Sequence, residues 1–236
     1  MIITSDFHTH TTFSHGTGSV EDNVRAAIDR NLSEIAIADH SVGHNAYGVR
    51  DIEAYLREID NIKIKYKDTI KVKSGLELNL LSDSGELDLP KGYEDCFDIL
   101  IFGYHKFVRY KGLSNAIHYL PPVSDSEKSI ARNTKAYINA LERYKIDIIS
   151  HPGYGLPINK IEVAKTAAKR NTYMEINNKH PEFTADELKI CAEIGVKFSV
   201  NSDAHSPEKV GIFTNSLAKI EEAGLPAELI LNAKEQ

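Results

Sequence analysis

The chain has 236 residues, of which 42% are hydrophobic and 26% charged, and its formal net charge is -6 at pH 7. This length supports one sizeable core, so we expect a single domain over residues 1–236, and the acidic balance argues against a broad basic surface for nucleic acid. The start, MIITSDFH, enters a strand with no signal peptide, and no apolar run is long enough to span a membrane. We therefore expect a cytoplasmic protein with no membrane partner, and we leave its oligomeric state open.

The first predicted elements are short runs rich in Ile and Val, which are typical of buried parallel strands. They cover residues 2–6, 34–38, 70–78, 99–103, 146–150, 172–176 and 197–201. Amphipathic segments between them predict helices at residues 19–31, 49–67, 129–144, 160–171 and 184–195. The first helix is expected to begin after Ser19 as N-cap, with Asp22 three residues further on.

Two segments depart from this alternation. Residues 79–93 alternate apolar and polar positions around Ser84 and Gly85, which predicts a β-hairpin at the pocket edge. The Pro121–Pro122 segment is interpreted as a rim loop. Seven strands with intervening helices predict an α/β fold, most simply a seven-stranded β/α barrel.

Histidines cluster at the ends of the predicted strands. In a β/α barrel the carboxyl ends of the strands meet on one face, so histidines far apart in sequence converge there. Seven of the ten histidines follow apolar runs in this way, at His8, His10, His15, His40, His105, His151 and His205. Imidazole is the commonest metal ligand, so this placement predicts a metal centre.

Two carboxylates complete the predicted donor set. Glu77 and Asp203 also fall at strand ends, and the period of two in extended backbone puts His8 with His10, and Asp203 with His205, on one side. The only cysteines, Cys96 and Cys191, form no CxxC pair, so the ligands are nitrogen and oxygen. Such a set suits zinc, manganese or iron.

The motifs DFHTHTTFSHG, ADH, GLELN, GYH, SHPG and NSDAH resemble, in this order, those of the PHP (polymerase and histidinol phosphatase) family. The resemblance covers nearly the whole chain and is strongest to the family's small stand-alone YcdX-like phosphatase branch. It implies a distorted (β/α)7 TIM-like barrel holding three divalent metal ions at the strand ends.

The resemblance also implies a division of the nine ligands. His8, His10, Glu77 and Asp203 would hold one ion and Glu77, His105 and His151 a second, whereas His15, His40 and His205 would hold a third. Glu77 would be the bridging carboxylate.

Clustered divalent ions suit phosphoester hydrolysis, because they activate a bound water and neutralise charge on the attacking and leaving oxygens. We therefore predict a metal-dependent phosphoric ester hydrolase, a phosphatase on a small phosphorylated metabolite that uses a metal-activated hydroxide. Glu77 and Asp203 are the predicted catalytic residues. Glu77 would act through the ions, whereas proton transfer falls to Asp203 or to a histidine next to a ligand, and the sequence does not choose between these two. Lys179, Lys106 and Arg109 lie after strand ends and are the candidate contacts to phosphate.

Other polar residues near the strand ends have structural alternatives. Asp6 and Asp39 either orient histidine rings or cap turns. His44 and His118 match no ligand position, and we expect structural roles for both. His180 follows the sixth strand and is a candidate to face substrate.

Two other functions stay open from the sequence. One is a metal-dependent nuclease or exonuclease on nucleic-acid ends, against which the lack of a basic stripe argues. The other is a non-catalytic, metal-binding regulatory module. No Walker or dinucleotide motif is present, so no nucleotide cofactor is expected.

Overall fold

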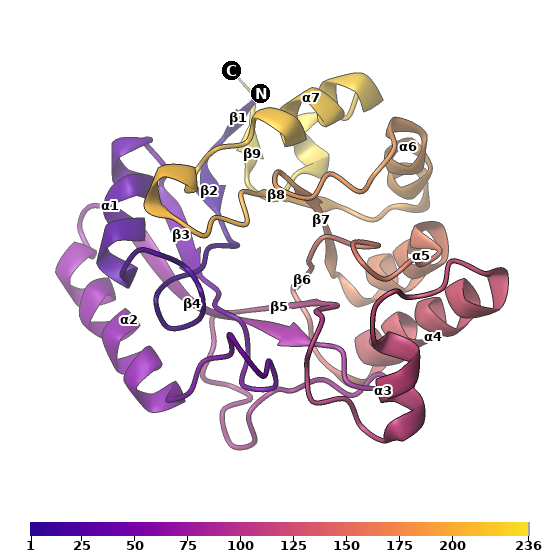
Figure 1. Ribbon diagram of the computed structural model, residues 1–236. Helices are drawn as coiled ribbons and strands as arrows, with labels where there is room; N and C mark the ends of the chain where they lie inside the picture. The colour runs from indigo at the N-terminus through magenta and orange to yellow at the C-terminus, as the bar shows by residue number, and fades with distance from the viewer. Residues whose placement is uncertain (236) are drawn as a thin grey trace.

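Helices and strands alternate along the chain in the computed structural model, which describes residues 1–235 (Figure 1). The strands are β1 (Ile2–Ile3), β2 (Ser5–Asp6), β3 (Glu34–Ile37), β4 (Lys71–Asn79), β5 (Ile99–Gly103), β6 (Ile148–Ile149), β7 (Tyr173–Asn177), β8 (Phe198–Asn201) and β9 (Ala233–Lys234). The α-helices are α1 (Val20–Asp29), α2 (Ile52–Tyr66), α3 (Leu113–Tyr119), α4 (Glu127–Arg143), α5 (Lys160–Arg170), α6 (Ala185–Ile194) and α7 (Thr214–Ala223). Two 3-10 helices, η1 (Pro207–Lys209) and η2 (Ala227–Leu229), complete the set.

The main sheet is a nearly closed barrel of seven parallel strands in sequence order, from β2 to β8. Its first and last strands meet beyond their ends, where Thr9 and Ala204 form a parallel bridge and the His10 N–H donates to the Ala204 carbonyl at 2.8 Å. The predicted seven-stranded α/β barrel is confirmed. All seven carboxyl ends therefore open on the same face.

Alternation along the strands separates an outer core from a barrel interior. In β4, Leu76 and Leu78 pack in the outer core against the helices, and Glu77 between them has the opposite orientation. The interior holds a separate apolar cluster of Phe7, Ala36, Ala38, Ile99, Ile101 and Ile148. The polar side chains thus lie at the carboxyl ends of the barrel strands, and the apolar cluster fills the barrel interior below them.

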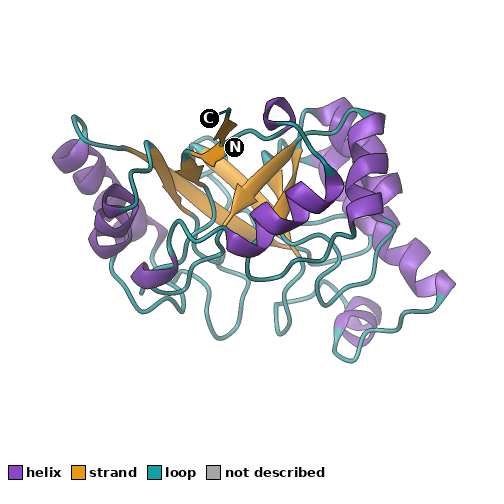
Figure 2. Ribbon diagram, turned by 90° about the horizontal axis from the view of Figure 1, so that it is seen from above, coloured by secondary structure: helices purple, strands orange, loops and turns teal. Residues whose placement is uncertain are grey.

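Helices flank the strands, and long loops gather beneath them in Figure 2. The predicted start of α1 is confirmed: the Ser19 hydroxyl accepts from the Asp22 N–H at 3.1 Å, and the Asp22 carboxylate accepts from the Ser19 N–H at 2.9 Å. Such a cap stabilises a helix by about 1 kcal/mol. Thr184 and Glu187 form a second capping box at α6.

The structure corrects three local predictions. The first strand is split at Thr4, whose N–H donates to the Asn232 carbonyl, and β1 pairs with β9 instead of joining the barrel. The predicted hairpin is reduced to one antiparallel bridge between Leu80 and Leu87, and the Asp88 carboxylate that follows accepts from the backbone N–H groups of Asn79 and Gly43. Helices α3 and α7 were not predicted.

No helix within residues 1–235 combines the length and the apolar character needed to cross a membrane.

Candidate metal centre

The nine predicted ligand side chains lie together at the carboxyl face of the barrel. They come from the ends of five strands, β2, β3, β5, β6 and β8, and from within β4, and they are His8, His10, His15, His40, Glu77, His105, His151, Asp203 and His205. Neighbouring histidine rings have centroids 4.2 to 6.3 Å apart. The strand-end rule thus identified groups that share one site.

Glu77 is the centre of this cluster and is fully buried. Its Oε1 lies 3.0 Å from His151 Nε2 and 3.2 Å from His105 Nε2. His8 Nε2 is 3.3 Å from the same oxygen, while Oε2 faces His40 Nδ1 at 2.9 Å. One carboxylate therefore reaches donors from both sides of the cluster.

Asp203 forms the second carboxylate group, beside His8, His10 and His205. Its Oδ1 lies 3.3 Å from His10 Nε2 and 3.3 Å from His205 Nδ1. Lys179 Nζ approaches the same oxygen at 3.6 Å from the loop after β7. A cation is thus already placed beside this carboxylate.

Three sets of donor atoms in the described chain are close enough to share an ion: His8 with His10 and Asp203, His10 with His40 and His205, and His40 with Glu77 and His105. The first contains three of the four ligands expected for one ion and lacks Glu77, and His151, expected beside Glu77 and His105, enters none of the sets. His40, however, is shared between Glu77 and His205, and His15 enters none of the three sets, although its ring stacks on that of His40 at 4.9 Å.

Several buried nitrogen and oxygen atoms of the cluster have no hydrogen-bond partner, which indicates that the cluster binds cations. Of the 14 buried side-chain nitrogen and oxygen atoms in residues 1–235 that lack a hydrogen-bond partner, seven belong to the nine predicted ligands. Glu77 Oε2 and His40 Nδ1 are close but do not make a hydrogen bond of acceptable geometry. An unsatisfied buried polar group costs about 1–3 kcal/mol, so these atoms fit divalent ions.

The histidines of the cluster differ in their pKa, which matters because metal binding requires neutral imidazole. Burial lowers the pKa of His10 to about 3 and that of His15 to about 4. Burial alone would raise the pKa of Glu77, but the nearby charges of His105 and His8 outweigh it and hold the pKa well below its ordinary value. Near pH 7 the Glu77 carboxylate is thus ionised and the His10 and His15 rings are neutral. Against the effect of burial, the carboxylate of Glu77 raises the pKa of His8 and of His151, so an ion bound by these two rings would displace their protons.

Glu175, in the middle of β7, is a site residue that the sequence reasoning missed. Its carboxylate accepts from His8 Nδ1 at 2.8 Å and from the His151 N–H at 2.7 Å. The amide groups of Asn177 and Asn201 donate to it at 2.8 and 2.9 Å. Because Nδ1 of His8 donates to Glu175, Nε2 is left free to face the cluster.

Asp6 and Asp39 hold backbone and hydroxyl groups rather than histidine rings. Asp6 accepts from the N–H groups of Ser202 and Gly211, at 3.1 and 2.9 Å. Asp39 accepts from the N–H and hydroxyl of Thr11, each at 2.7 Å. Of the two alternatives for these residues, the orientation of histidine rings and the capping of turns, these contacts favour the capping of turns.

Backbone strain is concentrated at the site. Five non-glycine residues in the described chain have positive φ, and two of them, Asn31 and Asn171, lie within two residues of the end of a helix. The other three are His151 (φ 27°), Asp203 (φ 53°) and Phe107 (φ 61°), all lining one cavity. Such strain persists where surrounding contacts hold the residue, and it is common at functional sites.

A cavity of about 290 Å³ lies over the cluster, at the small end of ligand pockets. Lys106, Lys179 and His180, the candidates to face substrate, are among the residues that line it. His44, for which we expected a structural role, also lines it: the side chain is buried, and its Nδ1 accepts from the Tyr47 N–H at 3.1 Å.

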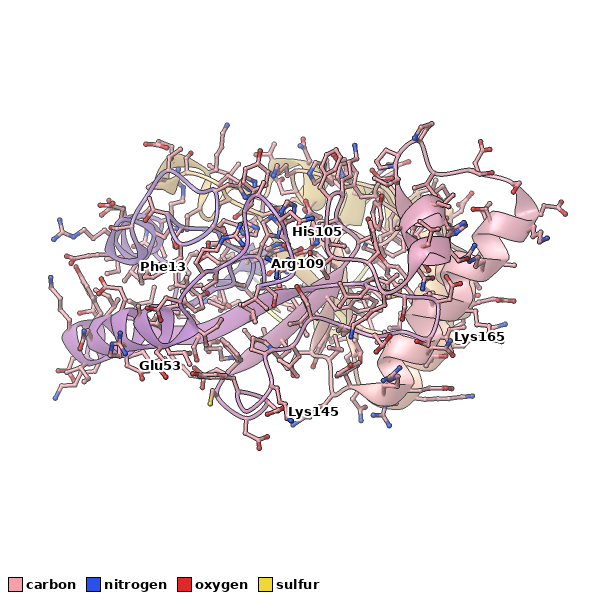
Figure 3. All side chains as sticks on the ribbon, turned by 60° about the horizontal axis from the view of Figure 1, so that its bottom comes forward. Phe13, Glu53, His105, Arg109, Lys145 and Lys165 are labelled. Atoms are coloured by element: carbon pink, nitrogen blue, oxygen red, sulfur yellow. The ribbon has the colours of Figure 1, made fainter. Side chains whose placement is uncertain are left out.

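Two other predicted positions lie away from this cavity. Arg109 follows His105 on the loop after β5 (Figure 3), but it is exposed and donates to Asn45 at 3.3 Å instead of lining the cavity. His118 lies beside Asn133, with 2.7 Å between Nε2 and Oδ1. In Figure 3, Lys145, which precedes β6, lies well apart from His105.

The barrel, the buried donor set and the relatives together define a metal-dependent phosphoesterase. A family model described as the PHP domain matches residues 6–180. The chain belongs to the PHP-domain family.

Named relatives agree with this assignment over almost the full chain. A probable phosphatase of Thermoanaerobacter sp. (strain X514) is 32% identical over 246 residues, covering 98% of this chain and 91% of the relative. A probable phosphatase of Shewanella sediminis is 31% identical, covering 96% and 88%.

A solved structure has the same fold. The histidinol phosphate phosphatase of Lactococcus lactis, crystallised with zinc, L-histidinol and phosphate, is 18% identical, with a TM-score of 0.70 over 96% of this chain and 95% of that one.

Proposed function

We propose that this chain, as one catalytic domain, hydrolyses a small phosphomonoester with the help of three divalent ions. The observation that carries the proposal is Glu77: a fully buried carboxylate faced by imidazoles, with no Lys or Arg paired to it among the described residues. A buried charge costs several kcal/mol unless positive charge faces it, and divalent ions would supply that positive charge while the imidazoles stay neutral. The zinc, histidinol and phosphate held by the Lactococcus lactis structure are consistent with this chemistry.

The proposed ligand division follows the family pattern. His8, His10, Glu77 and Asp203 would hold one ion and Glu77, His105 and His151 a second. His15, His40 and His205 would hold the third, with His40 near enough to Glu77 to be shared. Zinc, manganese and iron all suit this nitrogen and oxygen set.

Bound divalent ions would supply a water of lowered pKa and charge neutralisation at phosphorus. Side chains of the protein would bind the phosphate and transfer the proton. Lys179 would hold a non-bridging phosphate oxygen, and Lys106 would draw anions to the mouth. Asp203, placed between His10 and Lys179, is proposed to accept the proton of the attacking water and to pass it to the leaving-group oxygen.

Chelation tests the function directly. The purified protein should hydrolyse 4-nitrophenyl phosphate, lose this activity on dialysis against a strong chelator, and regain it when Zn²⁺, Mn²⁺ or Fe²⁺ is added back. Metal analysis should give between two and three ions per active chain. Hydrolysis that survives complete metal removal would rule out the proposal, and preference for a single-stranded oligonucleotide over phosphomonoesters would favour the nuclease alternative.

Replacing Lys179 with alanine tests the phosphate contact. Its Nζ reaches into the cavity, 3.0 Å from His205 Nδ1, and a hydrogen bond to a charged group contributes about 1.5–3 kcal/mol. Lys179→Ala should therefore lower kcat/KM by about tenfold to a hundredfold, with Lys179→Arg in between. Lys189→Ala, an exposed lysine on α6, is the control. Unchanged kcat/KM in Lys179→Ala would remove Lys179 from the contacts.

A further inference from the structure

The exposed aromatic side chains of this protein are all in one place. Among eleven tyrosines and eight phenylalanines, only Tyr47, Phe107 and Tyr154 are exposed, at 46, 59 and 37%. All three line the cavity over the metal centre. When large apolar side chains that are exposed to solvent gather at one site, they indicate a binding function.

Three different loops carry these rings. The loops that hold Tyr47 and Phe107 are fastened together by an antiparallel bridge between His44 and Val108, and the Asn45 N–H donates to the Phe107 carbonyl at 3.1 Å. Tyr154 follows β6 and stacks on His180, with ring centroids 3.7 Å apart and an interplanar angle of 19°. The mouth of the cavity thus has aromatic walls from separate segments.

Phe107 is the most exposed and least packed of the three rings. It has the largest exposure of the three, and no other aromatic ring in residues 1–235 lies against it, whereas Tyr47 stacks on His15 at 4.5 Å. Phe107 also has a φ of 61°, which is uncommon for a bulky residue. The backbone is therefore strained at Phe107, and the large apolar side chain of this residue is exposed to solvent at the mouth of the cavity.

Positive charge at the mouth of the cavity disfavours a cationic ligand. Aromatic walls attract quaternary ammonium groups when no cation competes. Here Lys106 and Lys179 line the same cavity. The acids that line it, Glu77 and Asp203, are buried and face histidines. A neutral flat ring can stack on Phe107 and Tyr154 without this repulsion.

We infer that the preferred substrate is a phosphomonoester whose leaving group carries a neutral, flat ring, placed against Phe107 and between the loops of Tyr47 and Tyr154. This inference rests on the proposed phosphatase function and adds the chemical class of the leaving group. The phosphoryl group would lie over the metal centre, with the ring at the mouth.

Three esters with the same two-carbon linker separate the possibilities. 2-Phenylethyl phosphate carries a flat ring, 3,3-dimethylbutyl phosphate a neutral branched group, and phosphocholine a cation of similar size. We expect kcat/KM to be about fivefold to tenfold higher for the phenyl ester than for either of the others. Equal values for the phenyl and dimethylbutyl esters, or a preference for phosphocholine, would overturn the inference.

Variants and a binding measurement complete the test. Phe107→Ala keeps Cβ and the backbone strain but removes the ring, so it should reduce the phenyl-to-dimethylbutyl ratio to within about twofold. Ile64→Ala, which removes an exposed apolar side chain on α2, should leave the ratio unchanged. A ratio that Phe107→Ala does not alter would exclude this ring from recognition.

Calorimetry with the matching uncleavable phosphonates should give the same order of affinity for the metal-loaded protein. If no ester is cleaved, the proposed function fails, while the phosphonate affinities still decide whether the mouth prefers a flat ring.

Discussion

Glu77→Gln should remove more than one metal ion per chain and reduce kcat/KM by about a thousandfold. Glu77 lies within 3.0 to 3.3 Å of nitrogens from His151, His105 and His8, and its second oxygen faces His40. An uncharged amide of the same shape cannot bridge ions, because one of its two polar atoms is a donor. Loss of several kcal/mol of electrostatic stabilisation corresponds to this fall in rate.

Metal analysis and thermal unfolding together check the Glu77 prediction. Because the nearby charges of His105 and His8 hold the pKa of Glu77 well below its ordinary value, the folded state stabilises the ionised carboxylate, so the metal-free variant should unfold at a lower Tm than the metal-free wild type near pH 7. Added metal should raise the Tm of the wild type far more than that of the variant. The control is Glu193→Gln on the exposed face of α6, and a Glu77→Gln protein that keeps its full metal content would contradict the bridging role.

The ends of the strands were predictable because the apolar runs that define a strand are a local pattern of the sequence. Short Ile- and Val-rich runs placed β5 at its observed bounds and five other barrel strands within two residues of theirs, whereas the start of β2 lies three residues after the predicted one. Parallel topology then brought His8, Glu77 and His151 to the same face, whatever the loops between them do. The convergence of the nine side chains required no knowledge of loop structure.

Loop paths and rotamers were not predictable in the same way. His44 lies in the cavity because its loop pairs with Val108, a contact across more than sixty residues that no local pattern encodes. The sharing of His40 between Glu77 and His205 depends on side-chain orientation within loops. Arg109 was expected at the mouth from its position three residues after Lys106, but the turn of the chain directs it to Asn45.

Glu175 escaped notice for a different reason: it lies within a strand rather than beyond its end. The segment YMEIN did contain a signal, since a charged residue stands at the position that alternation assigns to the barrel interior, as Glu77 does in GLELN. A carboxylate in such a buried position needs donors. Glu77 in β4 thus lines the cavity, whereas Glu175 in β7 holds the His8 ring and the His151 backbone.

Glu175→Gln should weaken metal binding by about tenfold to a hundredfold, the usual effect of losing a group that orients a metal-binding histidine. Four donors converge on this carboxylate, from His8, His151, Asn177 and Asn201. A glutamine offers one accepting oxygen, and its NH₂ would face donors. His8 would then lose the partner that fixes its Nδ1 proton and leaves Nε2 free.

Rescue by metal distinguishes orientation from direct binding. At saturating metal, Glu175→Gln should recover most of its kcat, whereas Glu77→Gln should not. Asp88→Asn is a matched control, because Asp88 is also buried and accepts from Asn79 and Gly43 but has no hydrogen bond to an imidazole. Both variants should lose about 1–3 kcal/mol of stability through unpaired donors, but only Glu175→Gln should need more metal for half-maximal activity. Equal metal requirements in the two variants would show that Glu175 supports the fold alone.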